Sequence, residues 1–473
     1  MKKVIERPAM YFSSLEIENV KSFEKKQILD LKNSDGTIAP WTLILGDNGV
    51  GKTTLLHCLA WMIPVEAPPL KKETDDLSEE INNDQKVVHV KAYMDDLDEE
   101  VFEHLIRIGE DVQTRISVTL TNDISLGQKP TTDNTVSISM EFEKINGKLE
   151  VIKPEYGELS SFNTPNIFAY GANRHVAYKN IDNSELKNPI YNLFSQSGDL
   201  YDAEQVLSML DTASIRQKRK GKATDLLVKI KEILIDLLPD IKSPDCIVIN
   251  SPINDDGSIN KNIVEVQTED GRVKLFNMSL GYVTMLTWIV DLAVHMLWRF
   301  SESDEPLKQP AIVIVDEIDL HLHPIWQRAI MKKLTNHFPG TQFICTAHSP
   351  IMAQASEQQN LAVVKRIEDK DVVIANDPHI VVGWRIGQLL TSELFDFDSE
   401  RGPEVDQLLE DRRNLLRIDV LSPEEQAQLD NLNTKIDQIP IGDTKEEDDA
   451  AKILKDFSKK LALLKAESDD KNK

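Results

Sequence analysis

The pattern of apolar and polar residues near the start of the chain predicts two strands, both of which precede a glycine-rich turn. Residues 14–23 (SLEIENVKSF) alternate at the two-residue period of a strand, and residues 41–45 (WTLIL) form a short apolar run typical of a central strand. The run after Lys52 (TTLLHCLAWMI) is mostly apolar, which predicts a buried helix that ends before Pro64. A glycine-rich turn joins the second strand to this helix.

The next part of the chain has the pattern of an antiparallel β-lobe, which we expect to lie beside the glycine-rich turn. Residues 66–85 are polar and acidic, which predicts a surface loop. Asn146-Gly147 separates two alternating runs and predicts a hairpin turn. The segments with a strand pattern are residues 86–94, 115–121, 135–152 and 166–170.

The pattern then changes from strands to helices and back. Residues 180–245 place apolar residues at helical spacing around the basic run RQKRKGK, which predicts a helical insertion. Residues 246–401 alternate strands and helices, including a long helix from Leu280 and a helix from Pro324, which predicts a parallel α/β sheet. Residues 402–473 are acidic and helical, with a capping box at residues 422–425. A stripe on the last helix comprises Ile453, Phe457, Leu461 and Leu464.

Composition and charge restrict the class of protein. Of the 473 residues 41% are hydrophobic and 28% are charged, which is typical of folded domains. The net charge of -25 repels polyanions, so nucleic-acid binding would need a local basic patch. The three cysteines lack disulfide or zinc spacing, and no apolar signal core follows MKKVIERPAM, so we expect a cytoplasmic protein. Residues 278–300 contain Asp291, His295 and Arg299, which favours a buried helix over a membrane span.

The glycine-rich turn carries the first candidate site. Residues 46–54 (GDNGVGKTT) fit the pattern GxxxxGK[ST] between a predicted strand and a predicted helix, the context that this motif needs. Main-chain N–H groups would surround phosphates, Lys52 would add a positive charge, and the Thr53 hydroxyl could ligate Mg²⁺. A glycine turn without a ligand is the alternative, and the agreement of motif and context disfavours it. The residues predicted to bind ATP are Asn48, Gly49, Val50, Gly51, Lys52, Thr53 and Thr54.

Two carboxylates complete the hydrolytic half of this site. The apolar strand of residues 311–315 delivers Asp316 and Glu317 at its end. Asp316 would hold the Mg²⁺, and Glu317 would orient and polarise the attacking water, since phosphoryl transfer depends on positioning and charge neutralisation. Taken alone, two carboxylates after an apolar strand usually mark only the end of the strand and have no catalytic role. The catalytic interpretation of this pair depends on Lys52.

Two short segments indicate the class of P-loop protein to which the chain belongs. Residues 277–281 (NMSLG) precede the long helix and resemble the LSxG signature of ABC-type ATPases, and residues 346–350 (TAHSP) resemble their switch histidine. Either segment alone could be a helix cap or part of the core. Their order relative to the turn and the carboxylate strand favours functional roles for Ser279, Gly281 and His348.

With ENVKSF, YGANR and DEIDLHLHP added, the chain is similar to the ABC ATPases of the RecF/SMC/OLD branch over residues 12–395. Within that branch it most resembles the OLD-like ATPases of anti-phage defence, especially the PtuA proteins of Septu systems, whose partner is the HNH nuclease PtuB. The resemblance implies an α/β P-loop core with a mixed sheet, an antiparallel β-lobe, a helical insertion and a helical C-terminal extension. The implied regions are a first ATPase lobe (1–179), the insertion (180–245), a second ATPase lobe (246–401) and a partner-docking extension (402–473).

The resemblance also implies how complete sites form. Ser279 and Gly281 of one copy would contact the γ-phosphate bound by another copy, in a head-to-tail homodimer within a larger homo-oligomer. His348 would act at the same phosphate. OLD nucleases carry a C-terminal Toprim domain with acidic residues on strands, whereas Asp396-Phe397-Asp398 and the acidic groups after Gly402 lack that context. We therefore expect no nuclease site in this chain.

Several residues keep two interpretations. His321 and His323 have metal-ligand spacing, but the resemblance places His323 in a D-loop at the dimer interface. Arg174 could reach a phosphate or the opposite subunit, or it could pair with a carboxylate. The basic run could contact nucleic acid or form a solvated helix end, and its residues are Arg216, Lys218, Arg219, Lys220 and Lys222.

The sequence predicts an ABC-type ATPase that senses or clamps and passes its state to a partner effector. A RecF/SMC-like DNA-repair clamp that binds DNA directly and an autonomous OLD-like nuclease are the alternatives. ATP-dependent DNA binding by the isolated chain would favour the clamp, and a nuclease gene beside this gene would favour the effector interpretation.

Overall fold

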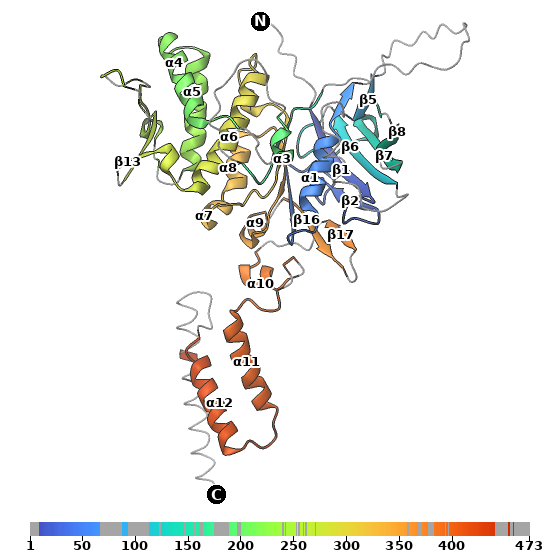
Figure 1. The fold of residues 1–473 in the computed structure, drawn as a ribbon, viewed down its shortest axis with the longest axis vertical. Helices are drawn as coiled ribbons and strands as arrows, with labels where there is room; N and C mark the ends of the chain where they lie inside the picture. The colour runs from blue at the N-terminus through green and yellow to red at the C-terminus, as the bar shows by residue number, and fades with distance from the viewer. Residues whose placement is uncertain are drawn as a thin grey trace, which may run out of the picture. The chain divides into compact units, whose positions relative to one another are not determined.

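The structure is a computed structural model in which the chain forms two compact units, Met1–Asp396 and Phe397–Lys473. Figure 1 shows their elements. The structure describes residues 9–439 with gaps, and beyond them residues 453, 454 and 457. The gaps are residues 67–87, 93–112, 123, 146–147, 156, 160–163, 175–188, 196–199, 239–240, 242, 252, 254–255, 259, 261–262, 270, 357–358, 368–370, 377–382, 393 and 396.

Some expectations from the sequence fall on residues that the structure does not describe. They are the loop predicted for residues 66–85 beyond Glu66, the hairpin turn Asn146-Gly147, and the stripe residues Leu461 and Leu464. The region boundaries predicted at residues 180, 246 and 402 stay predictions.

A six-stranded sheet lies at the centre of the first unit and confirms the predicted α/β class. Its order is β10-β14-β15-β3-β16-β17, and all neighbours are parallel except β16 and β17. Because β3 is an interior strand, its apolar residues 41–45 are buried on both faces, as the sequence predicts. The strands are β3 (Trp41–Gly46), β10 (Ile167–Tyr170), β14 (Ala311–Val315), β15 (Thr341–Thr346), β16 (Asn360–Arg366) and β17 (Val372–Asn376).

The predicted antiparallel β-lobe is a five-stranded sheet of order β2-β1-β6-β7-β8, which includes the predicted strand segments of residues 115–121 and 135–152. The first strand of the chain, β1, lies between β2 and β6 in this sheet, and its Ile17 lies opposite Ile116 of β6. The prediction is wrong for residues 166–170, which form β10 of the central sheet because they pair in parallel with β14, and for residues 88–92 (β5), which lie in another sheet. A separate three-stranded sheet has the order β4-β5-β9. The strands are β1 (Met10–Glu18), β2 (Gln27–Asp30), β4 (Pro64–Glu66), β5 (Val88–Ala92), β6 (Thr114–Asn122), β7 (Thr135–Ile145), β8 (Lys148–Glu155) and β9 (Gly157–Leu159).

The long helix predicted after residue 278 is α6 (Leu280–Arg299), a core helix of the first unit. Its length and mean hydropathy of 1.5 would suit a membrane span, but 78% of its most apolar window is buried inside the structure. The carboxylate of Asp291 inside this helix accepts hydrogen bonds from the Tyr170 hydroxyl at 3.0 Å and the Tyr201 N–H at 2.9 Å. The buried charge is therefore satisfied within the fold.

The predicted helical insertion consists of α4 (Ala203–Arg216) and α5 (Lys222–Leu237), which pack against each other. Their apolar faces join the same hydrophobic core as α6. The helix predicted from Pro324 begins there but is interrupted after Gln327. The remaining elements are α1 (Lys52–Trp61), α3 (Tyr191–Phe194), α7 (Pro324–Gln327), α8 (Ile330–His337), α9 (Pro350–Ala355), α10 (Ile386–Leu390), β11 (Ile247–Ile249), β12 (Val264–Thr268) and β13 (Gly271–Lys274).

The second unit contains two helices, α11 (Pro403–Leu416) and α12 (Pro423–Ile436). The predicted capping box starts α12, because the Glu425 N–H donates to Ser422 Oγ at 3.2 Å and the Ser422 N–H donates to Glu425 Oε2 at 2.7 Å. Ile453 and Phe457 of the predicted stripe are exposed at 69% and 62%. Both therefore offer apolar surface, as the sequence suggests.

The packing of α1 against α3 predicts an acid-sensitive contribution to stability. Burial lowers the pKa of His57 from 6.5 to about 4, and its Nε2 lies 3.3 Å from the Leu193 carbonyl oxygen. The unfolded chain therefore binds a proton that the folded chain excludes, so this stability is complete above pH 6.5 and is lost as the pH falls toward 4. From pH 7 to pH 5 the loss is about 2 kcal/mol.

Urea unfolding at pH 7 and pH 5 would measure this loss in the wild type and in His57→Gln, which keeps a donor but does not titrate. We expect the variant to lose less stability between the two pH values than the wild type. His321→Gln, which removes an exposed imidazole, is the control and should follow the wild type. An equal loss in all three proteins would contradict the prediction.

Candidate nucleotide-binding site

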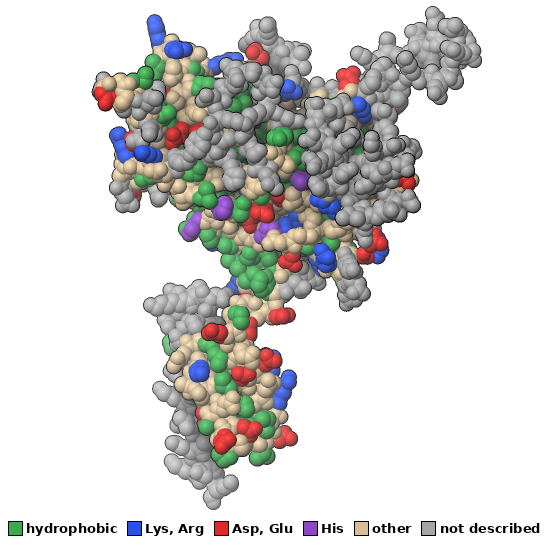
Figure 2. All heavy atoms as spheres, in the orientation of Figure 1, with side chains coloured by type: hydrophobic (Ala, Val, Ile, Leu, Met, Phe, Trp, Pro, Cys, Tyr) green, Lys and Arg blue, Asp and Glu red, His purple; other side chains and the backbone are tan. Residues whose placement is uncertain are grey.

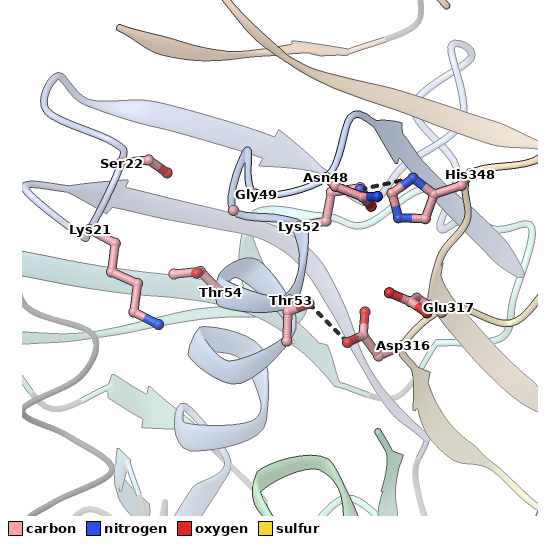
Figure 3. Close-up of a pocket in the computed structure, with 11 residues that line it drawn as sticks. Lys21, Ser22, Asn48, Gly49, Lys52, Thr53, Thr54, Asp316, Glu317 and His348 are labelled. Atoms are coloured by element: carbon pink, nitrogen blue, oxygen red, sulfur yellow. Dashed lines mark hydrogen bonds between the residues drawn. The ribbon is translucent and has the colours of Figure 1, made fainter. Parts of the chain in front are cut away.

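The glycine-rich turn occupies the position that its motif predicts, between β3 and α1 (Figure 3). Gly51 precedes the helix with φ 105°, a left-handed conformation that favours glycine. A Cβ there would lie 2.8 Å from both the Phe23 ring and Ser22 Oγ. The segment ENVKSF therefore packs directly on the turn, and only glycine fits beneath it.

Lys52 is held in place by the turn itself. Its ammonium donates to the carbonyl oxygens of Gly46 and Asp47, each at 2.8 Å, and lies 3.5 Å from His348 Nδ1. The side chain is only 6% exposed, and burial lowers its pKa, although the nearby carboxylates, led by Asp316, favour the charged form. The structure thus presents a buried cation at the floor of the turn.

Asp316 is the centre of a hydrogen-bond network at the ends of three parallel strands. Its Oδ2 accepts from the Thr53 hydroxyl at 2.8 Å, and its Oδ1 accepts from the Thr346 hydroxyl at 2.5 Å. Its main-chain N–H donates to the Tyr170 carbonyl oxygen at 2.8 Å. The structure therefore brings together Thr53 and Asp316, the predicted Mg²⁺ ligands, and adds Thr346, which sequence reasoning missed.

Glu317 adopts an unusual backbone conformation at the end of β14. Its φ of 47° is left-handed, which costs about 1–3 kcal/mol for a residue with a side chain. Its N–H donates to Thr346 Oγ1 at 2.7 Å. In Figure 3 its side chain lies beside Asp316 on the side of His348. The strain thus places both carboxylates at one site.

His348 is positioned by a residue that the sequence analysis did not single out. Asp319 Oδ2 accepts from the main-chain N–H groups of His348 at 2.9 Å and Ser349 at 2.7 Å. This carboxylate fixes the start of the segment that carries His348, the predicted switch histidine. Its place in DEIDLHLHP, two residues after Glu317, was the available signal.

A cavity of about 310 Å³ unites these groups, within the range of small-molecule sites. Figure 3 shows its lining residues, which come from the turn and the start of α1, from the end of β14, from the segment after β15 and from the segment between β1 and β2. The hydroxyl of Thr53 and the carboxylate of Asp316 are the oxygen donors that Mg²⁺ prefers, and glycines with Lys52 suit phosphates. The lining residues are Lys21, Ser22, Asn48, Gly49, Gly51, Lys52, Thr53, Thr54, Asp316, Glu317 and His348.

Lys21 and Ser22 are additional lining residues, contributed by the segment between β1 and β2. Ser22 Oγ donates to the Val50 carbonyl oxygen at 3.1 Å, and partial burial lowers the pKa of Lys21. The sequence pattern of this segment indicates no role at the site, because its approach to the turn depends on the pairing of β1 with β6. Lys21 brings a second cation to the cavity.

Ser279 and Gly281 do not line this cavity in the described part of the chain, although both lie at the start of α6 as predicted. Ser279 is exposed, and so is Leu280 at 64%. A Cβ on Gly281 would lie 2.1 Å from the His321 carbonyl oxygen, so the start of α6 packs tightly on the segment after Glu317. A single copy therefore presents this signature on its surface.

His323 caps α7, since its Nδ1 accepts from the Ile325 N–H at 3.4 Å. Among the described residues no group of three or more His, Cys, Asp or Glu side chains could hold a metal ion. Arg174 donates to the main-chain carbonyl oxygen of Glu317 at 2.7 Å, and it is not among the residues that line the cavity. Its described hydrogen bond is therefore to the main chain and not to a carboxylate.

The basic run forms the turn between α4 and α5, where Figure 2 shows Lys and Arg side chains (blue, top). Lys218 and Arg219 have φ values of 56° and 52°. Arg219 pairs with Asp211 at 3.3 Å, and Lys222 donates to the Ser301 carbonyl oxygen at 2.5 Å. Arg219 and Lys222 thus make contacts within the fold although both are exposed, and nucleic-acid contact by the run stays a prediction.

Comparison with known proteins places these motifs in a family context. The chain is 25% identical over 434 residues to the Septu protein PtuA of Bacillus mycoides, covering 90% of this chain and 50% of that protein. It is 35% identical over 96 residues to the retron Vc95 probable ATPase of Vibrio cholerae, covering 20% of this chain and 19% of that protein. The chain thus spans about half the length of its first curated relative, and the predicted resemblance to PtuA is confirmed.

Solved structures give a looser comparison. The SMC head domain from Thermotoga maritima is 12% identical with a TM-score of 0.36, covering 78% of this chain and 99% of that chain. The fold description therefore rests on the strand order itself. The model of the AAA ATPase domain matches residues 10–353. Since this match spans most of the chain and includes the turn, both carboxylates and His348, the protein belongs to the AAA ATPase domain family.

Proposed function

We propose that this chain binds ATP with Mg²⁺ and hydrolyses it to ADP and phosphate. The observation that carries the proposal is the 2.8 Å hydrogen bond between Thr53 of the turn and Asp316 of the carboxylate strand. It brings the phosphate-binding and hydrolytic motifs into one cavity with Lys52, Glu317 and His348. Membership of the ATPase domain family supports the same reaction.

Each side chain has a distinct task in this proposal. The glycine turn and Lys52 bind the phosphates, and Thr53 with Asp316 would hold the Mg²⁺. That ion would neutralise phosphate charge when bound. Glu317 orients the attacking water, and His348 acts at the γ-phosphate. Lys21, from the segment that packs on the turn, adds positive charge at the edge of the cavity.

We further propose that complete sites form between two head-to-tail copies. Ser279 lies at the N-terminus of a 20-residue helix, where a hydroxyl, main-chain N–H groups and the helix dipole favour a phosphate. In one copy this end is exposed and does not line the cavity. A second copy would bring its Ser279 and Gly281 to the phosphate bound at Lys52, within a larger homo-oligomer.

The proposed biological role is regulation of a nuclease effector in anti-phage defence. Similarity to the Septu protein PtuA and to a retron ATPase supports this setting, and the resemblance to Septu systems suggests an HNH nuclease (PtuB-like) as the partner. Exposed apolar residues of the second unit, Leu416 at 56% and Val420 at 85%, offer a surface for it. The alternatives are a clamp that binds DNA directly, through the exposed part of the basic run, and an OLD-like nuclease.

Variants of Glu317 and Lys52 should distinguish the catalytic half of the site from the half that binds ATP. We expect Glu317→Gln to keep Mg-ATP bound while kcat falls at least about 100-fold, because the amide keeps the shape but cannot polarise water. Lys52→Ala should weaken ATP binding at least about tenfold, since it removes a charge-assisted contact. Phosphate release and equilibrium binding of a fluorescent ATP analogue would measure both. Wild-type turnover by Glu317→Gln would refute the assignment of the base.

Mixing of inactive variants tests the head-to-tail site. Ser279→Arg should bind ATP but not hydrolyse it, because the arginine would occupy the γ-phosphate position. After subunit exchange, a 1:1 mixture with Lys52→Ala contains mixed dimers in which one of two sites is intact, so about a quarter of the wild-type rate should return. Each variant mixed with itself is the control. No recovery in the mixture, or normal hydrolysis by Ser279→Arg alone, would contradict the model.

Co-purification distinguishes the effector role from its alternatives. The chain would be expressed with an HNH nuclease encoded beside it, and Val420→Asp should reduce nuclease recovery about tenfold by placing a charge in an apolar contact. Ile253→Asp, at a residue that is 60% exposed in the first unit, is the matched control. Normal recovery with Val420→Asp would exclude this surface. ATP-dependent DNA binding by the isolated chain would favour the clamp, and DNA cleavage by it would favour the nuclease.

A further inference from the structure

A buried arginine stands behind the catalytic carboxylates without lining the nucleotide cavity. Arg174 follows β10, the edge strand that runs parallel to β14, so its loop lies next to the end of β14 where Asp316 and Glu317 begin. The side chain is 4% exposed. Its Nη2 donates to the carbonyl oxygen of Glu317 at 2.7 Å. This contact reaches the main chain of the residue that orients water.

The loop that carries Arg174 is itself fixed from two sides. The Tyr170 carbonyl oxygen accepts from the Asp316 N–H at 2.8 Å, and the Gly171 N–H donates to Asn192 Oδ1 at 2.9 Å. A Cβ on Gly171 would lie 2.8 Å from the Asn192 carbonyl oxygen, so the loop packs closely on α3. The guanidinium therefore projects from an anchored backbone, as positioning of another group requires.

A contribution to the stability of the fold does not explain why a charged arginine is buried at position 174. Burial lowers its pKa to about 10, so the guanidinium is charged at neutral pH, and the surrounding carboxylates, led by Asp316, favour that charge. Among the described residues, no group accepts from its Nε or Nη1. A buried cation with unused donors costs stability that an apolar side chain of similar size would not. Its presence points to a role in the site.

Glu317 shows what that role is. Its left-handed backbone, with φ 47°, is gripped at both ends: its N–H donates to Thr346 Oγ1 at 2.7 Å, and its carbonyl oxygen accepts from Arg174. We propose that Arg174 is a positioning residue that holds the Glu317 peptide in this strained conformation and so keeps its carboxylate aimed at the attacking water. Thr346, which accepts from the Glu317 N–H, holds the other end of this residue.

The inference rests on the proposed ATP hydrolysis, and Arg174→Met tests it. The methionine keeps the length but cannot donate, so Glu317 can relax; kcat should fall about 100-fold, as expected for a displaced catalytic group. KM and the affinity for ATP should change less than about threefold, because Arg174 is not among the residues that line the cavity. Steady-state phosphate release and binding of a fluorescent ATP analogue give the two readouts.

Combination with Glu317→Gln provides the second test. If Arg174 acts through Glu317, Arg174→Met should cost much less in the Glu317→Gln background, measured by single-turnover hydrolysis, than in the wild type. Arg299→Met is the matched control, because Arg299 donates to Asn166 Oδ1 at 2.8 Å near the opposite end of β10. Its kcat should stay within about threefold of the wild type, since no catalytic group is displaced there.

Circular dichroism melting separates positioning from folding. A parallel fall of kcat, ATP affinity and melting temperature in Arg174→Met would overturn the inference in favour of a structural role. If that variant does not fold, Arg174→Lys decides, because it keeps the cation and loses the planar donor; kcat should fall about tenfold at unchanged KM. Normal turnover in the decisive variant would overturn this inference alone, whereas no hydrolysis by the wild type would overturn the proposed function with it.

Discussion

The structure of the site depends on the hydrogen bonds that one buried carboxylate accepts. Asp316 is 4% exposed, and a charge in that position needs donors. Two threonine hydroxyls supply them, Thr53 from the first turn of α1 and Thr346 from the end of β15. These donors come from segments that are remote in sequence and meet only because β3, β14 and β15 are parallel neighbours. The network therefore fixes the glycine turn against Asp316 and Glu317.

Local signals were enough to predict the parts of this site but not their connections. The glycine turn, the apolar strand before Asp316 and the order of the motifs are properties of short segments, so they could be read from the sequence and the structure places them together. Thr346, Asp319 and Lys21 were missed because their roles depend on partners far along the chain. For the same reason, pattern alone predicted the first strand without revealing its pairing with β6.

Charge is distributed unevenly in a chain whose net charge is -25. Lys21 and Lys52 line the cavity and Arg174 lies behind it, and burial lowers the pKa of each of them. The fold thus concentrates desolvated cations where a polyphosphate would bind, and desolvation strengthens their attraction for it. The basic run of the insertion is different, because all of its side chains are exposed to solvent, and Arg219 and Lys222 also contact Asp211 and Ser301.

The same strand end also joins catalysis to the surface that a second copy would use. Gly281 packs so closely on the His321 carbonyl oxygen that any side chain there would clash. His321 has a left-handed φ of 62° and lies four residues after Glu317, within the segment whose Asp319 holds the start of the His348 segment. A displacement of α6 by a partner would therefore press on the residues between Glu317 and His348. In the proposed head-to-tail dimer, engagement of the exposed Ser279 end of α6 and alignment of Glu317 and His348 would then be one mechanical event, and a single copy would hold these side chains in place but need a second copy for turnover.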